Sequence, residues 1–461
     1  MGSRIAWCLV VVSVCAIAGA AKAAEPKKLN RDASSLVIVL GGDLGLGGSG
    51  QPINSNGGYR HGKLISWKKL TNGIAPLLNG DVNFGNLESV VTNKRKLSPV
   101  DKLFTFQMHA NGARHLVDVG FNVFSIANNH SRDFGQLGMR QTLRHLKRLR
   151  QNGLLAAPGL GAGRRAALAP SLIKVKGAAI AVSALGIGGT QPGRHNRRIG
   201  QASYSSIVDF GEILTALAGA KADYKILSAH YGRELSIRPS ASAVRKLRDQ
   251  AVAKHGTDLV VGHHAHVASG IQRIGRRLIL YGLGNLLHLG MQDMAKFGHC
   301  RDFGLIVRLH LERDADKGLK AAAIEAIPLT RMHAAARAMS PVAAGKRIAV
   351  LNGLANELDH QPSGAVGVRF KVNREGHGVY CFVDGESEKR AVHPLCRDRQ
   401  MPLRDVGAVR CSRLSKTILA RSSRNRLDRK KIIRKRRRTV RSSTQNKKNL
   451  TSRIFGSVYA N

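Results

Sequence analysis

The sequence predicts an α/β fold, and two observations support this class. Short apolar segments with the length of buried strands alternate with longer segments that have helical spacing. Polar side chains suited to binding or catalysis fall just after several of the apolar segments. Strands that alternate with helices indicate βαβ units and a largely parallel arrangement of strands.

The elements follow one another in this order as far as residue 330. The expected strands cover residues 36–40, 82–85, 122–126, 171–175, 179–184, 224–228, 258–261, 277–280, 303–311 and 323–328. The expected helices cover residues 66–78, 111–119, 136–151, 206–219 and 240–255. A Gly-rich loop follows the first strand to about Gly62. We therefore assign residues 36–330 to one domain.

The composition changes after residue 330. A helix over 345–358 and strands over 366–372 and 378–383 predict a small C-terminal α+β module, rich in β structure, at residues 341–411. The four cysteines outside the N-terminal apolar run are Cys300, Cys381, Cys396 and Cys411, and the last three of them lie in this module. Four cysteines allow three disulfide pairings, and their spacing contains no CxxC of a zinc knuckle.

The N-terminus has the pattern of a secretory signal. Arg4 precedes an apolar run from Ile5 to Ala18, which is too short to span a bilayer comfortably. The sequence Ala21-Lys22-Ala23 fits a signal-peptidase site. We expect residues 1–23 to be cleaved after Ala23 and the chain to be exported to the periplasm or cell envelope; the alternative is an uncleaved anchor.

The chain is strongly basic, with a formal net charge of +45. Residues 412–461 carry 17 lysines and arginines against the single acid Asp428, and they predict a disordered basic tail. This charge favours anionic partners, namely an anionic polymer, a phosphorylated substrate or, through the tail, an anionic membrane surface. With export, no nucleic acid partner is expected. The sequence carries no indication of the oligomeric state.

Polar residues after the strands predict the functional site. The set is Asp43, Glu88, Asn129, His130, His230, His264, His266 and Asn285. Ligands of α/β folds bind at the carboxyl edge of the sheet, so these side chains are expected to converge there. His264 and His266 are one residue apart, and in an extended segment both imidazoles would point the same way. His263 is expected to pack or hydrogen-bond behind this pair.

Two acidic residues compete for the role of carboxylate ligand near the second strand. Asp81 precedes that strand, whereas Glu88 follows it. At about 3.3 Å per residue, Asp81 is placed near the opposite edge of the sheet. We therefore expect Glu88 to be the ligand and Asp81 to be a capping or turn residue.

The predicted ligands are oxygen and nitrogen atoms without sulfur. Such a set suits Zn, Mn or Fe, and it is large enough for two divalent ions. Two metals about 3.5–4 Å apart suit the hydrolysis of phosphoesters. His130 is placed to donate a proton or to stabilise an oxyanion. Asp133 either lines the pocket or caps the next helix.

The order of these motifs resembles the capsule-synthesis protein CapA family. The resemblance covers about residues 36–330 and rests on Gly-Asp43, Asn86-Leu87-Glu88, Asn128-Asn129-His130, His230-Tyr-Gly-Arg-Glu234, His264-Ala-His266 and Tyr281-Gly-Leu-Gly-Asn285. Proteins of this family are associated with poly-gamma-glutamate capsules and resemble calcineurin-like metallophosphatases. The resemblance implies a four-layer α/β/β/α sandwich of metallophosphatase type.

The resemblance also implies the roles of individual residues. The metal ligands it implies are Asp43, Glu88, Asn129, His230, His264 and His266. His130 and Asn129 would act in catalysis, and the substrate pocket would be lined by Asn86, Asn128, Glu234 and Asn285. The implied activity is that of a hydrolase, which uses a metal-bound hydroxide on a phosphoester or on a bond of an anionic polymer. The alternative is a non-catalytic component of capsule assembly that binds the polymer.

Three positions depart from the typical metallophosphatase pattern. That pattern has Asp-x-His after the first strand, where this sequence has Asp43-Leu44-Gly45, and it has Asp where this sequence has Glu88. Its Gly-Asn-His motif is Asn128-Asn129-His130 in this sequence. The number of metal ions, one or two, stays open at this point.

Overall fold

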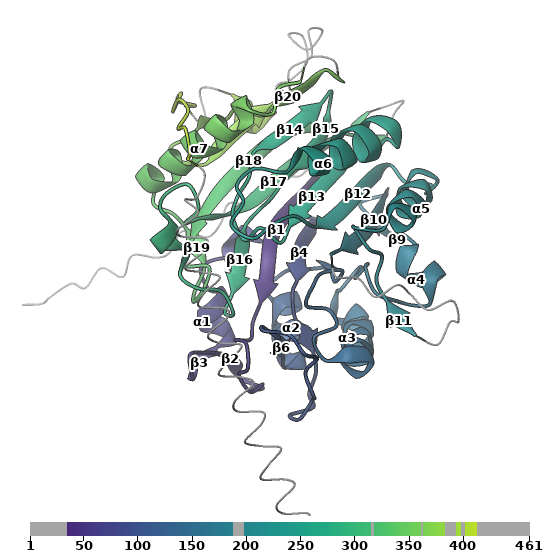
Figure 1. The fold of residues 1–461 in the computed structure, drawn as a ribbon. Coiled ribbons are helices and arrows are strands. Elements are labelled where there is room, and N and C mark those ends of the chain that lie inside the picture. The colour runs from purple at the N-terminus through teal and green to yellow at the C-terminus, as the bar shows by residue number, and fades with distance from the viewer. Residues whose placement is uncertain are drawn as a thin grey trace, which may run out of the picture. The chain divides into compact units, whose positions relative to one another are not determined.

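The computed structural model describes residues 35–187, 198–314, 318–360, 363–382, 393–397 and 402–412. These residues form a mixed α/β fold with two large sheets, each of which contains parallel and antiparallel strands (Figure 1). The expected signal at residues 1–23 and the expected basic tail beyond Ser412 lie outside the described residues.

The nine-stranded sheet is built around β1 (Ser35–Gly45). Its remaining strands are β4 (Val82–Leu87), β7 (Val123–Ser125), β16 (Asn285–His288), β17 (Gly304–Asp314), β18 (Gly318–Thr330), β19 (Arg337–Ala338), β21 (Lys371–Val372) and β22 (Gly378–Cys381). β4 runs parallel to β1, and β7 runs parallel to β4. The first part of β1 pairs with antiparallel β17, and its last residues pair with parallel β16. β16 therefore lies beside the carboxyl end of β1.

The seven-stranded sheet has parallel strands at its centre. It contains β9 (Ser171–Val175), β10 (Ala178–Gly186), β12 (Tyr224–His230), β13 (Leu259–His263), β14 (Ile271–Ile274), β15 (Arg277–Leu280) and β20 (Ala365–Gly367). β10, β12, β13 and β15 run parallel to one another. β9, β14 and β20 are antiparallel and form the two sides. Both sheets are thus mixed, although the sequence predicted a largely parallel arrangement.

Alternate residues of the seven-stranded sheet face two different apolar cores. Leu259 and Val261 of β13 belong to the cluster shared with the nine-stranded sheet. Val260, between them, belongs to the cluster formed with Phe210, Leu214, Leu247 and other helical side chains. The alternation follows from the period of two along a strand. One face of this sheet therefore packs on the other sheet, and the other face packs on helices.

The helices that cover the seven-stranded sheet are α5 (Ile207–Ala218), α6 (Ala241–Val244) and the π-helical segment η3 (Arg245–Lys254), which continues α6 (Figure 1). The other described helices are α1 (Trp67–Thr71), η1 (Ala75–Leu77), α2 (Ala110–Asp118), α3 (Gly135–Leu149), η2 (Arg150–Asn152), α4 (Arg164–Leu168), η4 (Met294–Phe297), α7 (Pro341–Asn356) and η7 (Pro394–Cys396). Short two-stranded sheets pair β2 (Gly57–Arg60) with β3 (Lys63–Ser66), β5 (Val90–Val91) with β6 (Gln107–Met108), and β8 (Gly161–Ala162) with β11 (Ile199–Gly200).

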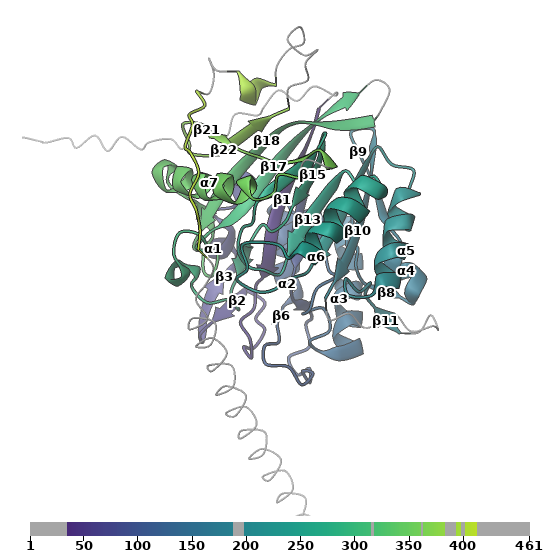
Figure 2. The same cartoon turned by 45° about the horizontal axis from the view of Figure 1, so that its top comes forward.

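The chain after residue 341 contributes to both large sheets. β20 pairs with β14 of the seven-stranded sheet, and β22 pairs with β18 of the nine-stranded sheet. α7 contacts strands of both sheets (Figure 2). Two disulfides, Cys300–Cys411 and Cys381–Cys396, identify the pairing that the sequence left open. The region predicted as a C-terminal module is thus joined to residues 36–330 by strand pairing and by one of these disulfides.

Several local predictions differ from the structure. The helix expected over 66–78 consists of the short α1 and η1, and the β2–β3 hairpin lies in the expected Gly-rich loop. Asn285 does not simply follow the strand over 277–280; it begins β16 in the other sheet. The expected strand over 366–372 is divided between β20 and β21. Among the described residues, no helix has the length and apolar character that crossing a bilayer requires.

Candidate metal centre

The predicted ligands meet where strands of both sheets end. Asp43 lies near the end of β1 and Glu88 follows β4, while His230 ends β12 and the 264–266 turn follows β13. These acidic and histidine side chains are buried: Asp43, Glu88 and His230 have 0% exposure, and His264 and His266 have 6% and 3%. The site therefore lies between the carboxyl ends of two sheets rather than along the edge of one.

The Glu88 carboxylate is at the centre of this cluster. Its oxygen Oε1 lies 3.6 Å from Nε2 of His230 and 3.8 Å from Nε2 of His130. Neither carboxylate oxygen has a hydrogen-bond partner among the described residues. A buried carboxylate without partners is strongly unfavourable, so its surroundings fit a bound cation.

Two groups of side chains are arranged to hold metal ions, and they share Glu88. One group is Glu88, His264 and His266, and the other is Asp43, Glu88 and His230. The ligand atoms within each group lie within 4.8 Å of one another. Both groups are buried and contain carboxylate and imidazole side chains, so either could hold a metal ion.

Asp43 organises the histidine turn. Its Oδ2 accepts a hydrogen bond from the backbone N–H of His264 at 3.3 Å and lies 3.1 Å from Nδ1 of His266. Its Oδ1 accepts a hydrogen bond from Asn86 at 2.9 Å and lies 3.3 Å from Nδ1 of His263. His263 also stacks on Phe84, consistent with the supporting place predicted for it.

His264 and His266 come together through a turn and not through an extended strand. β13 ends at His263, and the following residues His264 and His266 have φ values of +89° and +58°. Residues other than glycine rarely adopt positive φ, and such strain persists only where the surroundings impose it. The prediction of an extended segment was therefore wrong, although the two imidazoles, 6.0 Å apart between ring centres, still face one cluster.

Asparagine side chains connect the two sheets at the site. Asn129 Oδ1 lies 2.7 Å from Nε2 of His230, and Asn86 Nδ2 lies 3.2 Å from Nδ1 of the same ring. Asn128 donates hydrogen bonds to Oδ1 of Asn86 and to the backbone oxygen of Leu87. Asn129 is thus placed beside a metal-binding group, whereas Asn86 and Asn128 support the strand ends.

His130 is held in one orientation by Asp133 and Lys102. Its Nδ1 lies 2.6 Å from Asp133 Oδ2, and Asp133 Oδ1 accepts a hydrogen bond from Lys102 Nζ at 2.8 Å. The helix α3 begins at Gly135 with Phe134 as its N-cap residue, so Asp133 acts in the site and does not cap this helix. Because the carboxylate accepts from Nδ1, Nε2 of His130 points toward Glu88.

The two remaining predicted pocket residues lie close to the histidine turn. Nδ1 of His266 lies 2.9 Å from Oδ1 of Asn285, whose amide nitrogen bonds to the backbone oxygen of His266. Glu234 is half-buried in the loop after β12, and the backbone of that loop bonds to the turn from Leu235 N to Ala265 O. Asn285 therefore positions His266.

The buried charges shift the pKa values of the cluster in opposite directions. Burial alone would raise the pKa of Asp43, but the hydrogen bonds from His263 and His266 hold it well below its ordinary value. Burial and the Asp43 carboxylate raise the pKa of Glu88 well above its ordinary value. Burial and the neighbouring His266 lower the pKa of His264 to about 4. His264 is therefore neutral near pH 7, which is the form of imidazole that binds metals.

The pKa values of two further imidazoles in the cluster are also shifted in opposite directions. Burial would lower the pKa of His266, but the Glu88 and Asp43 carboxylates raise it to about 10. Burial and His264 lower the pKa of His230 well below its ordinary value. His266 is thus held in its cationic form by the carboxylates.

The sequence did not identify His288 as part of the site. This residue ends β16, has 0% exposure, and its Nε2 lies 3.7 Å from Oε2 of Glu88. The signal that was available is its position three residues after Asn285, but β16 was not predicted as a strand. The structure therefore adds a further imidazole to the cluster.

Asp81 lies away from this cluster, as predicted. Its Oδ2 accepts a hydrogen bond from the backbone N–H of Val37 at 2.8 Å, and its Oδ1 lies 3.2 Å from Lys176 Nζ. Val37 is near the beginning of β1, whereas Asp43 is near its end. Asp81 therefore joins the beginnings of β1 and β4, which lie at the end of these strands away from the cluster.

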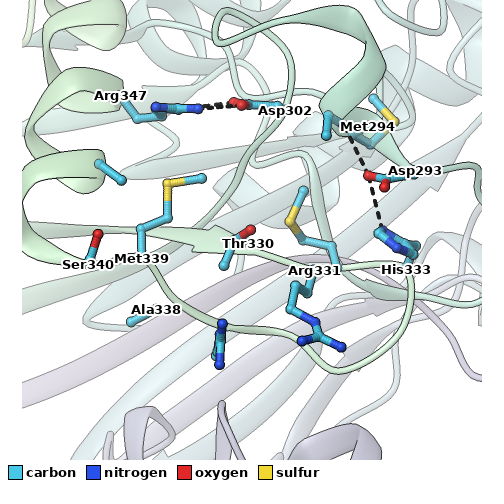
Figure 3. A pocket seen from close by; sticks show the side chains of 14 residues that line it. Asp293, Met294, Asp302, Thr330, Arg331, His333, Ala338, Met339, Ser340 and Arg347 are labelled. Carbon is cyan, nitrogen blue, oxygen red and sulfur yellow. Dashed lines mark hydrogen bonds and ion pairs between the residues drawn. The ribbon is translucent and has the colours of Figure 1, made fainter.

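A cavity of about 660 Å³ lies apart from these ligands. Its lining includes Arg331, Arg337 and Arg347, and none of the candidate ligands contributes to it (Figure 3). Arg347 pairs with Asp302, and His333 lies 3.5 Å from Asp293 (Figure 3). The cavity is a basic surface feature and not the metal cluster.

Comparison with known proteins identifies the family. Residues 37–288 match the family described as "Bacterial capsule synthesis protein PGA_cap". The chain is 26% identical over 287 residues to "PGA biosynthesis protein CapA" of Bacillus subtilis (strain 168), covering 61% of this chain and 71% of that protein. It is 25% identical over 284 residues to "Capsule biosynthesis protein CapA" of Bacillus anthracis, covering 58% and 62% respectively. The resemblance inferred from the motifs is confirmed.

Solved structures match more distantly. A hypothetical protein from Thermus thermophilus has 13% identity and a TM-score of 0.35, with 64% of this chain and 98% of that chain covered. The NAD nucleotidase (NadN) of Haemophilus influenzae has 12% identity and a TM-score of 0.33, with 68% and 61% covered. These scores are too low to assign the fold. The match over residues 37–288 is more than half of the sequence, and the chain belongs to the bacterial capsule synthesis protein PGA_cap family.

Proposed function

We propose that this chain is an exported, metal-dependent hydrolase of capsule polymer synthesis that acts on a phosphoester or on a bond within an anionic polymer. The observation that supports it best is the Glu88 carboxylate, which is fully buried, lacks hydrogen-bond partners among the described residues and belongs to both metal-binding groups. Such a group is expected where a cation is bound.

The residues of the two groups would hold two divalent ions of Mn, Zn or Fe. Asp43, Glu88 and His230 would bind one, with Asn129 beside His230, and Glu88, His264 and His266 would bind the other. Bound ions of this kind lower the pKa of water and neutralise negative charge on a reacting oxygen. The strained turn at His264 and His266 supports this role, because backbone strain is concentrated at functional sites.

His130 would exchange a proton with the substrate through Nε2. Asp133 accepts from Nδ1, so the imidazole is fixed in orientation and its other nitrogen faces the cluster. Burial lowers the pKa of His130, although Asp133 acts in the opposite direction. Asp133 and Lys102 are then positioning residues, since they hold His130 in place.

The remaining parts of the proposal concern fold type, location and partner. Two facing sheets with helices outside are in keeping with a four-layer α/β/β/α sandwich of metallophosphatase type. The two disulfides suit an oxidising compartment outside the cytoplasm. The net charge of +45 suits an anionic polymer such as the poly-gamma-glutamate of the capsules associated with the family.

The proposal is tested by metal analysis together with an activity assay on the full chain. We expect about two equivalents of metal and release of aryl alcohol from an aryl phosphate, or shortening of poly-gamma-glutamate. Replacement of His264 and His266 by asparagine, which tolerates positive φ, should reduce both measurements. A native chain without bound metal would contradict the proposal.

A second candidate is a non-catalytic assembly component that binds the polymer. The basic cavity beside α7 favours it, because Arg331 and Arg337 there would attract carboxylates. Metal-loaded chain that binds polymer, but cleaves neither polymer nor aryl phosphate, would support this candidate. The double variant Arg331→Gln and Arg337→Gln should then lose polymer binding while it keeps its metal.

The basic tail has a separate test. If residues 412–461 hold an anionic polymer or membrane, their removal should weaken retention on an anionic matrix at low salt. Equal retention of the shortened chain would exclude this role for the tail.

A further inference from the structure

We propose that His288 is a metal ligand, and that its imidazole is supplied from β16 because β1 has glycine at position 45. This inference rests on the metal centre proposed above and extends its ligand set. It assigns a histidine that neither the motif pattern nor the two metal-binding groups contain.

The pairing of the strands brings this histidine to the site. β16 is parallel to β1, and in their register Gly45 is paired with His288 just as Asp43 is paired with Asn285. The backbone N–H of His288 donates to the oxygen of Met332, which fixes the end of β16. His288 is therefore held beside Gly45, two residues after Asp43, by sheet pairing and not by a mobile loop.

The glycine at position 45 provides the space for the imidazole. A Cβ atom at Gly45 would lie 2.6 Å from Nε2 of His288, and its three nearest atoms would all belong to that ring. Gly45 does not have a positive φ, so its backbone does not require glycine. The absent side chain instead leaves room for a ring that comes from the neighbouring strand.

The imidazole of His288 faces the shared carboxylate and has no partner in the described structure. Nε2 lies 3.7 Å from Oε2 of Glu88, on the side opposite to Oε1, which faces His130 and His230. Neither ring nitrogen makes a hydrogen bond to a described residue, although the side chain has 0% exposure. A buried polar group left without a partner is unfavourable, and a bound cation would offset that cost.

Packing alone is the competing explanation. The ring of His288 meets the ring of Phe106 edge-on at 4.9 Å between centres, and it lies 5.5 Å from the ring of His266. An apolar side chain would make the same contact with Phe106 without burying two unpaired nitrogen atoms. In the Asp-x-His pattern a histidine would stand at position 45. This chain has Gly45 there, and the ring of His288 occupies the space beside it.

The test compares metal binding by the full chain and by His288→Phe, which keeps a ring against Phe106. Mn²⁺ binding is followed by titration and elemental analysis, and Co²⁺ binding by its visible absorption. We expect His288→Phe to lose one equivalent, or to bind Mn²⁺ at least about tenfold more weakly, with a changed Co²⁺ spectrum. His145→Phe, a buried histidine of α3 outside the cluster, serves as the matched control and should bind as the native chain does.

The outcomes separate this inference from the function on which it rests. Equal binding and equal spectra for native chain and His288→Phe would show that His288 only packs, while the metal centre stands. Failure of the native chain to bind metal would overturn the proposed centre itself. Should His288→Phe not fold, anomalous diffraction from Mn²⁺-soaked native crystals decides: Nε2 at roughly 2.2 Å from an ion supports ligation, and a clearly longer separation overturns it.

An exchange of the two residues gives a positive test. The double variant Gly45→His and His288→Gly places an imidazole on β1 and removes the ring from β16. The removed ring leaves space for the new imidazole. We expect this variant to regain part of the Mn²⁺ affinity that His288→Gly alone loses. No recovery, with a folded protein, would contradict the idea that these two positions share one imidazole site.

Discussion

Nε2 of His230 and Oδ1 of Asn129 lie 2.7 Å apart, although they come from different sheets. Asn129 follows β7 of the nine-stranded sheet, and His230 ends β12 of the seven-stranded sheet. This contact closes the cluster on the side of His130. The centre therefore depends on how the two sheets are docked.

Replacement of Asn129 by alanine should weaken metal binding more than it weakens folding. Asn129 is half-buried, so little apolar contact is lost, whereas His230 loses a polar neighbour. We expect the Kd for Mn²⁺ to rise on the order of tenfold, measured by titration calorimetry. Asn122→Ala is the control, because Asn122 bonds to Asn83 and Asp81 at the other end of β7 and should change stability alone.

Replacement of Glu88 by glutamine should change stability in opposite directions with and without metal. Without metal, the variant replaces a buried carboxyl group whose charged form is disfavoured, and we expect it to be at least as stable as the native chain. With saturating Mn²⁺, the native chain should be the more stable of the two, because only it gains the linkage free energy of binding. Thermal unfolding with EDTA and with Mn²⁺ measures both effects; the same order of stability in both conditions would contradict the assignment.

Stability should fall in acid because of a second buried carboxylate, Glu325 of β18. It pairs with Arg308 at 2.7 Å and lies 2.7 Å from Nδ1 of His377. Burial alone would raise the pKa of Glu325, but His377 and Arg308 lower it to about 2. A pKa depressed in the folded state contributes stability above the unfolded value of 4.5, and this contribution is lost as the pH falls from about 4.5 to about 2.

Denaturant unfolding of the native chain and of Glu325→Gln tests this pH dependence. We expect the ionised Glu325 to contribute up to roughly 3 kcal/mol at pH 6 and much less at pH 2.5. The difference between native chain and variant should shrink accordingly. Glu375→Gln, a change at an exposed glutamate between β21 and β22, should show no comparable difference at either pH.

The two disulfides should contribute unequally to stability. Cys300 and Cys411 are 111 residues apart, and Cys381 and Cys396 are 15 residues apart. In the chain-entropy account, loops of these lengths correspond to about 4.7 and 3 kcal/mol. Replacing Cys300 and Cys411 by serine should therefore lower the unfolding free energy more than replacing the other pair. The reverse order, measured with denaturant, would indicate that local packing outweighs loop closure.

Strand ends were the most informative feature of the sequence. Asp43, Glu88, His230 and His266 were predicted from their places after apolar segments, and the structure brings all four into one cluster. This convergence could be predicted because period-two burial and the position of a strand end are local properties. The distinction between Glu88 and Asp81 depended only on the length of one strand.

The features that the sequence did not show are those that depend on distant pairing. β16 has four residues and follows a tight turn, so its apolar pattern is indistinguishable from that of a loop until β1 lies beside it. His288 was missed for this reason. The positive φ values of His264 and His266 are likewise imposed by the surroundings, since Asp43 binds the backbone of the turn from 221 residues away.

Because the cluster forms where two sheets meet, it can assemble only late in folding. Glu88 must come together with His264 and His266, so no partly synthesised or partly folded chain that lacks β13 and the turn after it can present both metal-binding groups. In the proposed function, ion uptake would consequently be a late step of maturation that follows the docking of the sheets. A chain that crosses a membrane unfolded would then acquire its ions on the far side, from whatever pool that compartment offers.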